Sequence, residues 1–158
     1  MHMTLETDYA VRIVEALTRQ GGRLDARTIA ERTRVPQRFA LKILRKLVAD
    51  GIVCSYKGVA GGYELARAPQ EITLREVIES VEGPYRMSRC QGDEYCCDHT
   101  NCRFHAIYGE ISQLVREKLD SYTFAAICAP EQGEACSHDC AGCGQHCAEK
   151  RDTAAEDL

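Results

Sequence analysis

Pro36 to Gly51 read PQRFALKILRKLVADG, and this stretch decides the fold. Its apolar residues recur at steps of three and four, which is the spacing of one helix face. Proline favours the first turn of a helix and glycine its C-terminal end, so both boundaries are marked. The other face is polar and basic, which predicts a helix that buries one side and presents cations on the other. The inward positions are Ala40, Ile43, Leu44, Leu47 and Val48.

The segments on either side of this helix predict the rest of the domain. The expected elements are helices over 7–20, with Thr7 as N-cap, 25–33 and 74–81, with Thr73 as N-cap, and strands over 52–57 and 62–65. The glycine-rich residues between the two strands predict a hairpin turn. Three helices followed by a hairpin are the element order of a winged helix-turn-helix domain, whose recognition helix enters the major groove of DNA.

The basic face of the central helix predicts DNA contacts. The first residues of a recognition helix reach base edges, where Gln37 is suited to adenine and Arg38 to guanine. Cations further along the helix are expected at phosphates, and the hairpin tip is expected in a minor groove, where glycine lets the backbone approach closely. The alternative is a solvated basic face. The predicted DNA-binding residues are Gln37, Arg38, Lys42, Arg45, Lys57 and Gly61, with Lys46 as a further phosphate contact.

Charge is distributed unevenly along the chain. The net charge is −4, but residues 1–70 hold 12 Arg and Lys against 7 Asp and Glu, whereas residues 71–158 hold 8 against 17. A basic first half suits DNA, and an acidic second half has to lie away from it. We see no apolar signal core and no stretch that could span a bilayer, so a cytoplasmic protein with no membrane partner is expected. We find no recognisable catalytic motif, so an enzyme is not expected.

A long amphipathic helix is expected to begin near residue 104. Apolar residues recur at three- and four-residue steps from Phe104 to Tyr122. This run corresponds to a helix of about 20 residues and about 30 Å. One small domain does not need a helix of that length, so it is expected to pair with a second copy in a homodimer.

Nine of the ten cysteines follow residue 89, and three of them are evenly spaced. Cys90, Cys96 and Cys102 are each separated by five residues, and His105 follows three positions later. Thiolates on one loop can converge on one metal centre, and sulfur ligands favour iron–sulfur clusters, zinc or copper(I). Structural zinc sites use shorter spacings, so the gaps of five favour the larger cluster. The alternative is a loop without a ligand.

A second group of cysteines lies near the C-terminus. Four thiolates within twelve residues can enclose one zinc ion or hold a second iron–sulfur cluster. The alternative is a tail that exchanges disulfides or delivers metal. The residues of this second predicted metal site are Cys136, Cys140, Cys143 and Cys147.

Residues 3 to about 128 resemble the Rrf2 family of winged-helix regulators, which includes IscR-like and NsrR-like members. The cysteine spacing together with the wing is the most specific part of the resemblance. The matching stretches are 7–12 (TDYAVR), 29–32 (IAER), 58–63 (GVAGGY) and the set Cys90, Cys96, Cys102 and His105. The resemblance implies a homodimer on a palindromic operator, with a cluster held in each subunit by the three cysteines.

The fourth ligand differs between members of that family. A histidine that matches His105 accompanies a 2Fe–2S cluster in IscR-like members. An acidic residue that matches Asp8, from the partner's first helix, accompanies a 4Fe–4S cluster in NsrR-like members. The spacing here favours His105 and 2Fe–2S, with Asp8 as the alternative. Cys97 departs from the family pattern and is a further alternative ligand or redox thiol, and Lys57 and Val59 stand where the family often has Arg and Pro.

The sequence therefore predicts a mainly α fold with a small β-hairpin wing. The expected parts are a winged helix-turn-helix DNA-binding domain (1–83), a cluster-binding loop (84–103), a dimerisation helix (104–128) and a Cys-rich tail (129–158). The predicted function is a transcription regulator, such as a repressor, whose binding to double-stranded operator DNA is controlled by an iron–sulfur cluster. The alternatives are the same fold sensing zinc or thiol oxidation, and a metal-delivery or electron-transfer protein.

Overall fold

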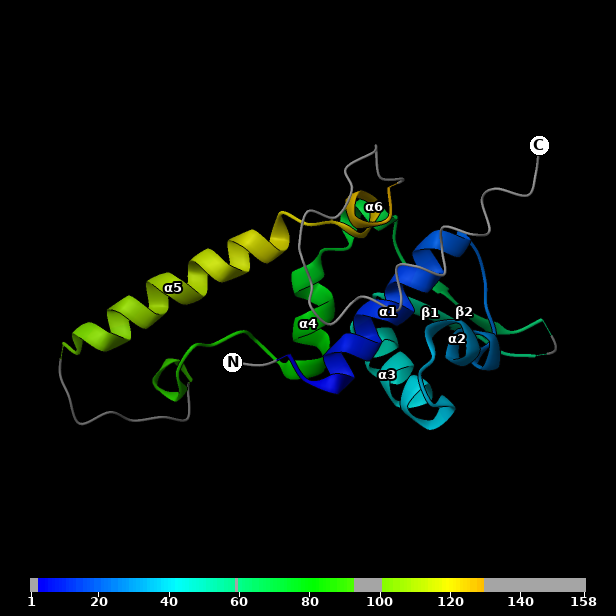
Figure 1. The fold of residues 1–158 in the computed structure, drawn as a ribbon, viewed down its shortest axis with the longest axis horizontal. Helices are drawn as coiled ribbons and strands as arrows, with labels where there is room; N and C mark the ends of the chain where they lie inside the picture. The colour runs from blue at the N-terminus through cyan, green and yellow to red at the C-terminus, as the bar shows by residue number, and fades with distance from the viewer. Residues whose placement is uncertain (1–2, 59, 93–100, 130–158) are drawn as a thin grey trace, which may run out of the picture.

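A computed structural model describes residues 3–58, 60–92 and 101–129 of the chain, which are mostly helical (Figure 1). The elements in chain order are α1 (Leu5–Gln20), α2 (Ala26–Thr33), α3 (Gln37–Ala49), β1 (Val53–Tyr56), β2 (Gly62–Leu65), the 3-10 helix η1 (Pro69–Glu71), α4 (Leu74–Glu82), the 3-10 helix η2 (Arg89–Gln91), α5 (Arg103–Asp120) and α6 (Phe124–Ile127). This order confirms the predicted three helices, hairpin and fourth helix.

One apolar core holds the body of the molecule together, and α1 lies at its centre. This helix contacts α2, α3, α4 and α6. Ile13 of α1, Ile43 of α3 and Phe124 of α6 are fully buried in this core. In Figure 1 the hairpin lies on one side of the body and α5 extends away from the other. Burial of the apolar faces thus packs α2 and α3 against each other and against α1.

The hairpin is an antiparallel pair that the rest of the body supports. Val53 pairs with Leu65 and Tyr56 with Gly62. Leu24, just before α2, adds an isolated bridge, because its backbone N–H donates to the Tyr63 carbonyl at 2.9 Å and its carbonyl accepts from the Tyr63 N–H at 2.7 Å. The wing is therefore attached to the segment that leads into α2.

Helix α1 begins earlier than the sequence pattern predicted. Thr4, and not Thr7, is the N-cap, and its hydroxyl accepts from the Thr7 N–H at 3.3 Å. Thr7 is buried, and its hydroxyl donates to the Glu82 carboxylate at the end of α4, as does that of Thr4. These two hydroxyls are the main reason that the pKa of Glu82 is lowered. The prediction of Thr7 as N-cap is wrong because a contact with distant α4 fixes its role.

The predicted single helix over 104–128 is divided in the structure. Helix α5 ends at Asp120, where the carboxylate accepts from Arg75 Nε at 2.8 Å and from the Thr73 hydroxyl at 3.1 Å. The Phe124 N–H then donates to the Ile72 carbonyl at 3.0 Å, and α6 follows. Phe124 therefore belongs to the core of the body and not to the long helix.

Candidate nucleic-acid interface and metal centre

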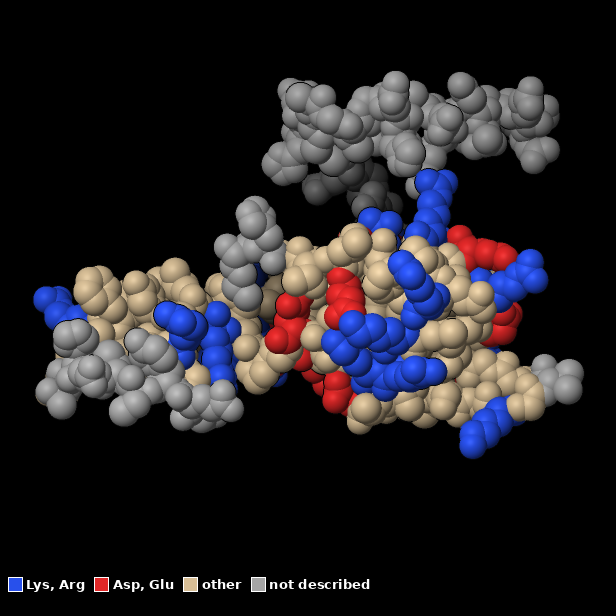
Figure 2. Space-filling model, turned by 90° about the horizontal axis from the view of Figure 1, so that it is seen from below, with Lys and Arg blue, Asp and Glu red and all other residues tan. Residues whose placement is uncertain are grey.

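The predicted recognition helix, α3, presents its predicted contact residues to solvent. Helix α3 starts after Pro36, and Gln37, Arg38, Lys42 and Arg45 are all exposed on it. Figure 2, which looks at the molecule from below Figure 1, shows Lys and Arg gathered on the face where α3 lies, with Asp and Glu beside them. This arrangement gives α3 the polar, cationic outer surface that a helix needs in the major groove.

One acidic side chain occupies part of this basic face. Glu6 of α1 forms an ion pair with Lys42 and a second one with Lys46 at 3.2 Å. The hydrogen bond from Lys42 is the largest cause of a lowered pKa at Glu6. Lys46 also donates to the Val81 carbonyl at 3.2 Å, so it links α3 to α1 and α4. Lys46 is expected at a phosphate, but in the structure its amine is directed toward Glu6 and the Val81 carbonyl. The apolar spacing of the helix does not indicate a partner on α1.

At the wing, the structure gives Gly61 a role within the turn. A Cβ at Gly61 would lie 2.5 Å from the Tyr56 carbonyl oxygen, so the turn itself excludes a side chain. Arg23 supports the same turn, because its guanidinium lies 3.6 Å from the centre of the Tyr56 ring and donates to the Ala60 carbonyl at 3.1 Å. Lys57 is exposed beside the turn. Sequence reasoning missed Arg23, since nothing local relates it to the wing.

The first predicted cluster ligand is held against the long helix by a hydrogen-bond network. Cys90 is half-buried in η2. The neighbouring Gln91 side-chain oxygen accepts from the N–H groups of Met87 and Ser88 at 2.9 and 3.2 Å and from the Ser112 hydroxyl at 2.9 Å. Ser112, on α5, is fully buried. The polar pair Gln91–Ser112 therefore fixes the position of Cys90 along α5.

Two further predicted ligands lie together at the start of α5. Cys102 is its N-cap residue and is half-buried, and His105 is exposed in the first turn. Cys102 makes no capping hydrogen bond, and no acidic residue stands in this turn. The N–H groups of the first turn and the positive end of the helix dipole therefore favour a negatively charged group there. A cluster bound by thiolates is such a group, so the residues present fit it.

The remaining ligand predictions fall partly outside the structure. Cys96 and Cys97, like the tail residues Cys136, Cys140, Cys143 and Cys147, lie outside the described residues. Asp8 is half-buried on α1 and pairs with Arg12 at 2.9 Å. Within ranges 3–58, 60–92 and 101–129, no three His, Cys, Asp or Glu side chains gather as metal ligands do. The structure thus brings Cys102 and His105 onto one helix end and places Cys90 beside the same helix.

Helix α5 leaves part of its apolar surface uncovered. Phe104 is 66% exposed, Ile107 46% and Leu114 58%. Their spacing of three and seven residues places them along one side of the helix. A stripe of this kind on a projecting helix is typical of an interface. As for membranes, none of the helices in the described part of the chain combines the length and apolar character of a bilayer span.

Comparison with known families and proteins gives a consistent result. A model of the Rrf2 family, described as an iron-dependent transcriptional regulator, matches residues 3–130. A putative HTH-type transcriptional regulator, ORF2, of Azotobacter vinelandii is 30% identical over 131 residues, which cover 82% of this chain and 80% of that protein. The HTH-type transcriptional regulator IscR of Aliivibrio salmonicida is 30% identical over 129 residues, covering 80% and 77%.

Solved structures with the same fold include two regulators. T. potens IscR superposes with a TM-score of 0.64 and 22% identity, covering 84% of this chain and 94% of that one. CymR (YrzC), the global cysteine regulator of B. subtilis, superposes with a TM-score of 0.66 and 24% identity, covering 82% and 97%. These likenesses confirm the predicted winged-helix architecture.

Proposed function

The chain belongs to the Rrf2 family of transcriptional regulators, and on that premise we propose that it is a homodimer whose binding to operator DNA is controlled by an iron–sulfur cluster. Its relatives are named as transcriptional regulators, so it is not an enzyme. The observation that carries the proposal is the position of the cysteine segment. This segment connects α4 of the DNA-binding body to α5, and it contacts both.

The proposed ligands are Cys90, Cys96 and Cys102, with His105 as the fourth. Asp8 of the partner subunit is the alternative fourth ligand. A 2Fe–2S cluster is favoured over 4Fe–4S because the position of His105 resembles that of the histidine ligand in IscR-like members of the family. When bound, such a cluster supplies a redox-active centre that oxygen or nitric oxide can alter.

The residues of this chain suggest how the segment affects the DNA-binding body. The Tyr85 N–H donates to the Glu79 carboxylate at 2.9 Å, so the segment is tied to α4 immediately after that helix ends. The first turn of α1 bonds both to Glu82 of α4 and, through Glu6, to α3. A shift of α4 therefore reaches the recognition helix through direct contacts. Small changes in the spacing of two recognition helices matter because both half-sites have to be engaged at once.

The proposed dimer uses the exposed stripe of α5. Its apolar side chains are the ones that a second copy would bury, and the helix projects from the body (Figure 1). Replacing Leu114 with glutamate should place a charge in that interface and give monomers in analytical ultracentrifugation, since an unpaired buried charge is strongly unfavourable. Gln113→Glu, at an exposed position about 100° around the same helix from Leu114, adds the same charge outside the stripe and should stay dimeric. A dimeric Leu114→Glu variant would contradict the assignment.

The C-terminal cysteines are proposed as a second metal site, for zinc or a second cluster. Cys136, Cys140, Cys143 and Cys147 have the number and the close spacing of a four-thiolate site. Truncation after Pro130 should remove one class of bound metal and leave the first in place. We also propose that the protein works in the cytoplasm, where reduced thiols persist.

The test of the cluster is metal analysis of protein prepared without oxygen. Iron and acid-labile sulfide should be present in the protein truncated after Pro130. Both should be absent when Cys90→Ser, Cys96→Ser or Cys102→Ser is introduced into that truncated protein. Cys54→Ser, in the wing strand, is the matched control and should keep its iron. His105→Ala and Asp8→Ala distinguish the two candidate fourth ligands. The substitution that removes the true ligand should change the visible absorption spectrum of the cluster, and the other should not. Colourless protein loaded with zinc that still binds DNA would favour zinc sensing instead.

A further inference from the structure

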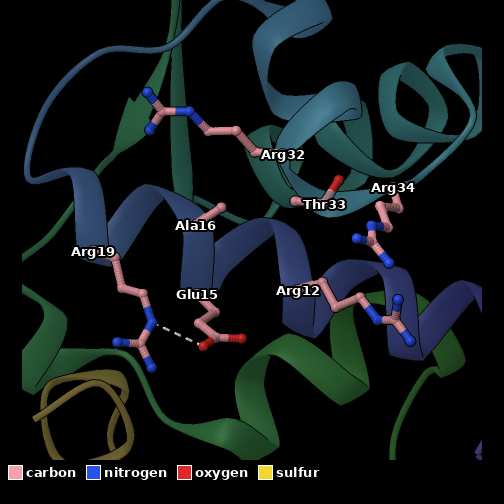
Figure 3. A pocket seen from close by; sticks show the side chains of 7 residues that line it. All are labelled: Arg12, Glu15, Ala16, Arg19, Arg32, Thr33 and Arg34. Atoms are coloured by element: carbon pink, nitrogen blue, oxygen red, sulfur yellow. Dashed lines mark hydrogen bonds and ion pairs between the residues drawn. The ribbon is translucent and has the colours of Figure 1, made fainter. Parts of the chain in front are cut away.

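An open cavity of about 490 Å³ lies between α1 and the end of α2, and arginines line it (Figure 3). Arg12 and Arg19 come from α1, while Arg32 and Arg34 come from the last turn of α2 and the residue after it. In Figure 3, Arg12 and Arg34 extend toward the same side of the cavity. Four guanidinium groups from two elements therefore surround one solvent-filled space.

Carboxylates neutralise only part of this charge. Arg12 pairs with Asp8 and Arg19 with Glu15, each at 2.9 Å. Arg32 donates to a neutral group, the side-chain oxygen of Gln20, at 2.5 Å. For the Arg34 guanidinium, the described residues contain neither a hydrogen-bond acceptor nor an ion-pair partner. Among the residues that the structure describes, Arg32 and Arg34 thus have no carboxylate partner.

The backbone at Arg34 is a second, independent observation. Its φ is 55°, which is the left-handed region that favours glycine. The residue ends α2, and its N–H donates to the carbonyls of Ala30 and Glu31. Glycine would close the helix there without strain. A long cationic side chain at this position therefore suggests a role outside the fold.

We propose that this arginine cavity binds phosphates of the operator backbone next to the half-site that α3 reads. The proposal rests on the proposed DNA-binding function and adds a contact outside the recognition helix and the wing. In helix-turn-helix docking the first helix of the pair crosses the DNA backbone, and here that helix is α2. Arg34 stands three residues before Gln37, so a groove-bound α3 brings it toward the flanking strand. Guanidinium groups bind phosphate oxygens with paired hydrogen bonds, and the guanidinium of Arg34 has no partner within the described ranges.

The test compares salt dependence of operator binding for the parent and Arg34→Gly. The probe is a labelled duplex carrying the operator that the parent selects from a randomised library. Each lost phosphate contact lowers the slope of log K against log salt by about 0.9, so a dimer should lose about 1.8. The ratio of the parent's operator-binding constant to that of Arg34→Gly should then fall about 12-fold between about 50 and 200 mM salt. Phosphate ethylation interference should also disappear at the flanking positions.

The control is Arg67→Gln, which follows β2 and lies outside the cavity and outside α2 and α3, where the native guanidinium pairs with Glu76 of α4 at 2.9 Å. It removes the same charge and should leave the slope unchanged. Arg34→Gly should melt no lower than the parent, because glycine relieves the left-handed strain, and Arg34→Asn serves as a second variant that tolerates this conformation. Equal slopes for the parent and both Arg34 variants would overturn the proposal.

Two other results would distinguish a failure of the proposed function from a failure of the arginine-cavity proposal. A parent that selects no operator would contradict the proposed function itself. Sodium tripolyphosphate that raises the melting temperature of the parent but not of Arg34→Gly, with equal DNA slopes, would show a site for free polyanions. That result would make the DNA assignment wrong.

Discussion

Replacing Glu6 with glutamine is expected to strengthen operator binding. Glu6 holds Lys42, a predicted phosphate contact whose side chain is 58% exposed, so the carboxylate competes with DNA for the same cation. The ion pair with Lys42 has to break when that lysine contacts a phosphate. Lys46 is directed inward to the Val81 carbonyl and does not have to move.

The size of the effect follows from the exposure of this pair. An exposed ion pair contributes about 0.2–1 kcal/mol, and Glu6 is held by two lysines, which favours the upper half of that range. A dimer that breaks two such pairs should gain about 1–2 kcal/mol, which is an increase in affinity of about 5- to 30-fold. The gain should shrink as salt rises, because salt screens the pair.

The same substitution should change the pH dependence of stability. Lys42 lowers the pKa of Glu6 in the folded state. The ion pair therefore stabilises the fold above the unfolded-state pKa, and this contribution is lost as the pH falls through the lowered folded-state value. Parent and Glu6→Gln should differ in free energy of unfolding at neutral pH and converge only as the pH falls below the lowered folded-state pKa of Glu6.

Fluorescence anisotropy with a labelled operator measures the affinity, and urea unfolding measures the stability. Glu117→Gln on α5 changes the net charge equally and lies outside the DNA-binding body, so it should bind as the parent does. The reasoning is refuted if Glu6→Gln binds no more tightly than the parent. Glu6 would then orient Lys42 toward DNA and not compete for it.

Three further substitutions test other parts of the account. Arg38→Ala should weaken operator binding by about 1–3 kcal/mol and relax preference at one base position, as judged by binding to single-base operator variants. Gly61→Ala should distort the wing, because its Cβ would lie 2.5 Å from a carbonyl oxygen, and lower both the melting temperature and DNA affinity. Ser112→Ala should remove one hydrogen-bond donor to the Gln91 side-chain oxygen. It should therefore destabilise the protein by about 1–3 kcal/mol and lower its iron content. The control, Ser121→Ala at an exposed position, should change neither the stability nor the iron content.

The sequence was informative where local chemistry decides the structure. The apolar spacing in 36–51 predicted α3 and its exposed face, and the capping Thr73 predicted the start of α4. Both depend on residues within one or two turns. The winged-helix fold followed from the order of such elements, since their apolar faces allow few arrangements.

Local patterns failed where distant contacts decide. Thr7 is a good N-cap residue by type, yet its hydroxyl bonds to Glu82, which lies 75 residues away in the sequence. The apolar residues after Asp120 continue a helical spacing, but Phe124 packs into the body and α5 stops. The pattern in 36–51 could not indicate the ion-pair partner of Lys46, because Glu6 lies on another helix.

The central claim is that cluster occupancy controls DNA binding, and one measurement tests it directly. The operator affinity of a single oxygen-free preparation is measured before and after chemical removal of the iron, with iron per subunit determined in both samples. The account predicts an affinity change of at least about tenfold, with Cys102→Ser fixed at the iron-free value. Equal affinities in the two samples would contradict it.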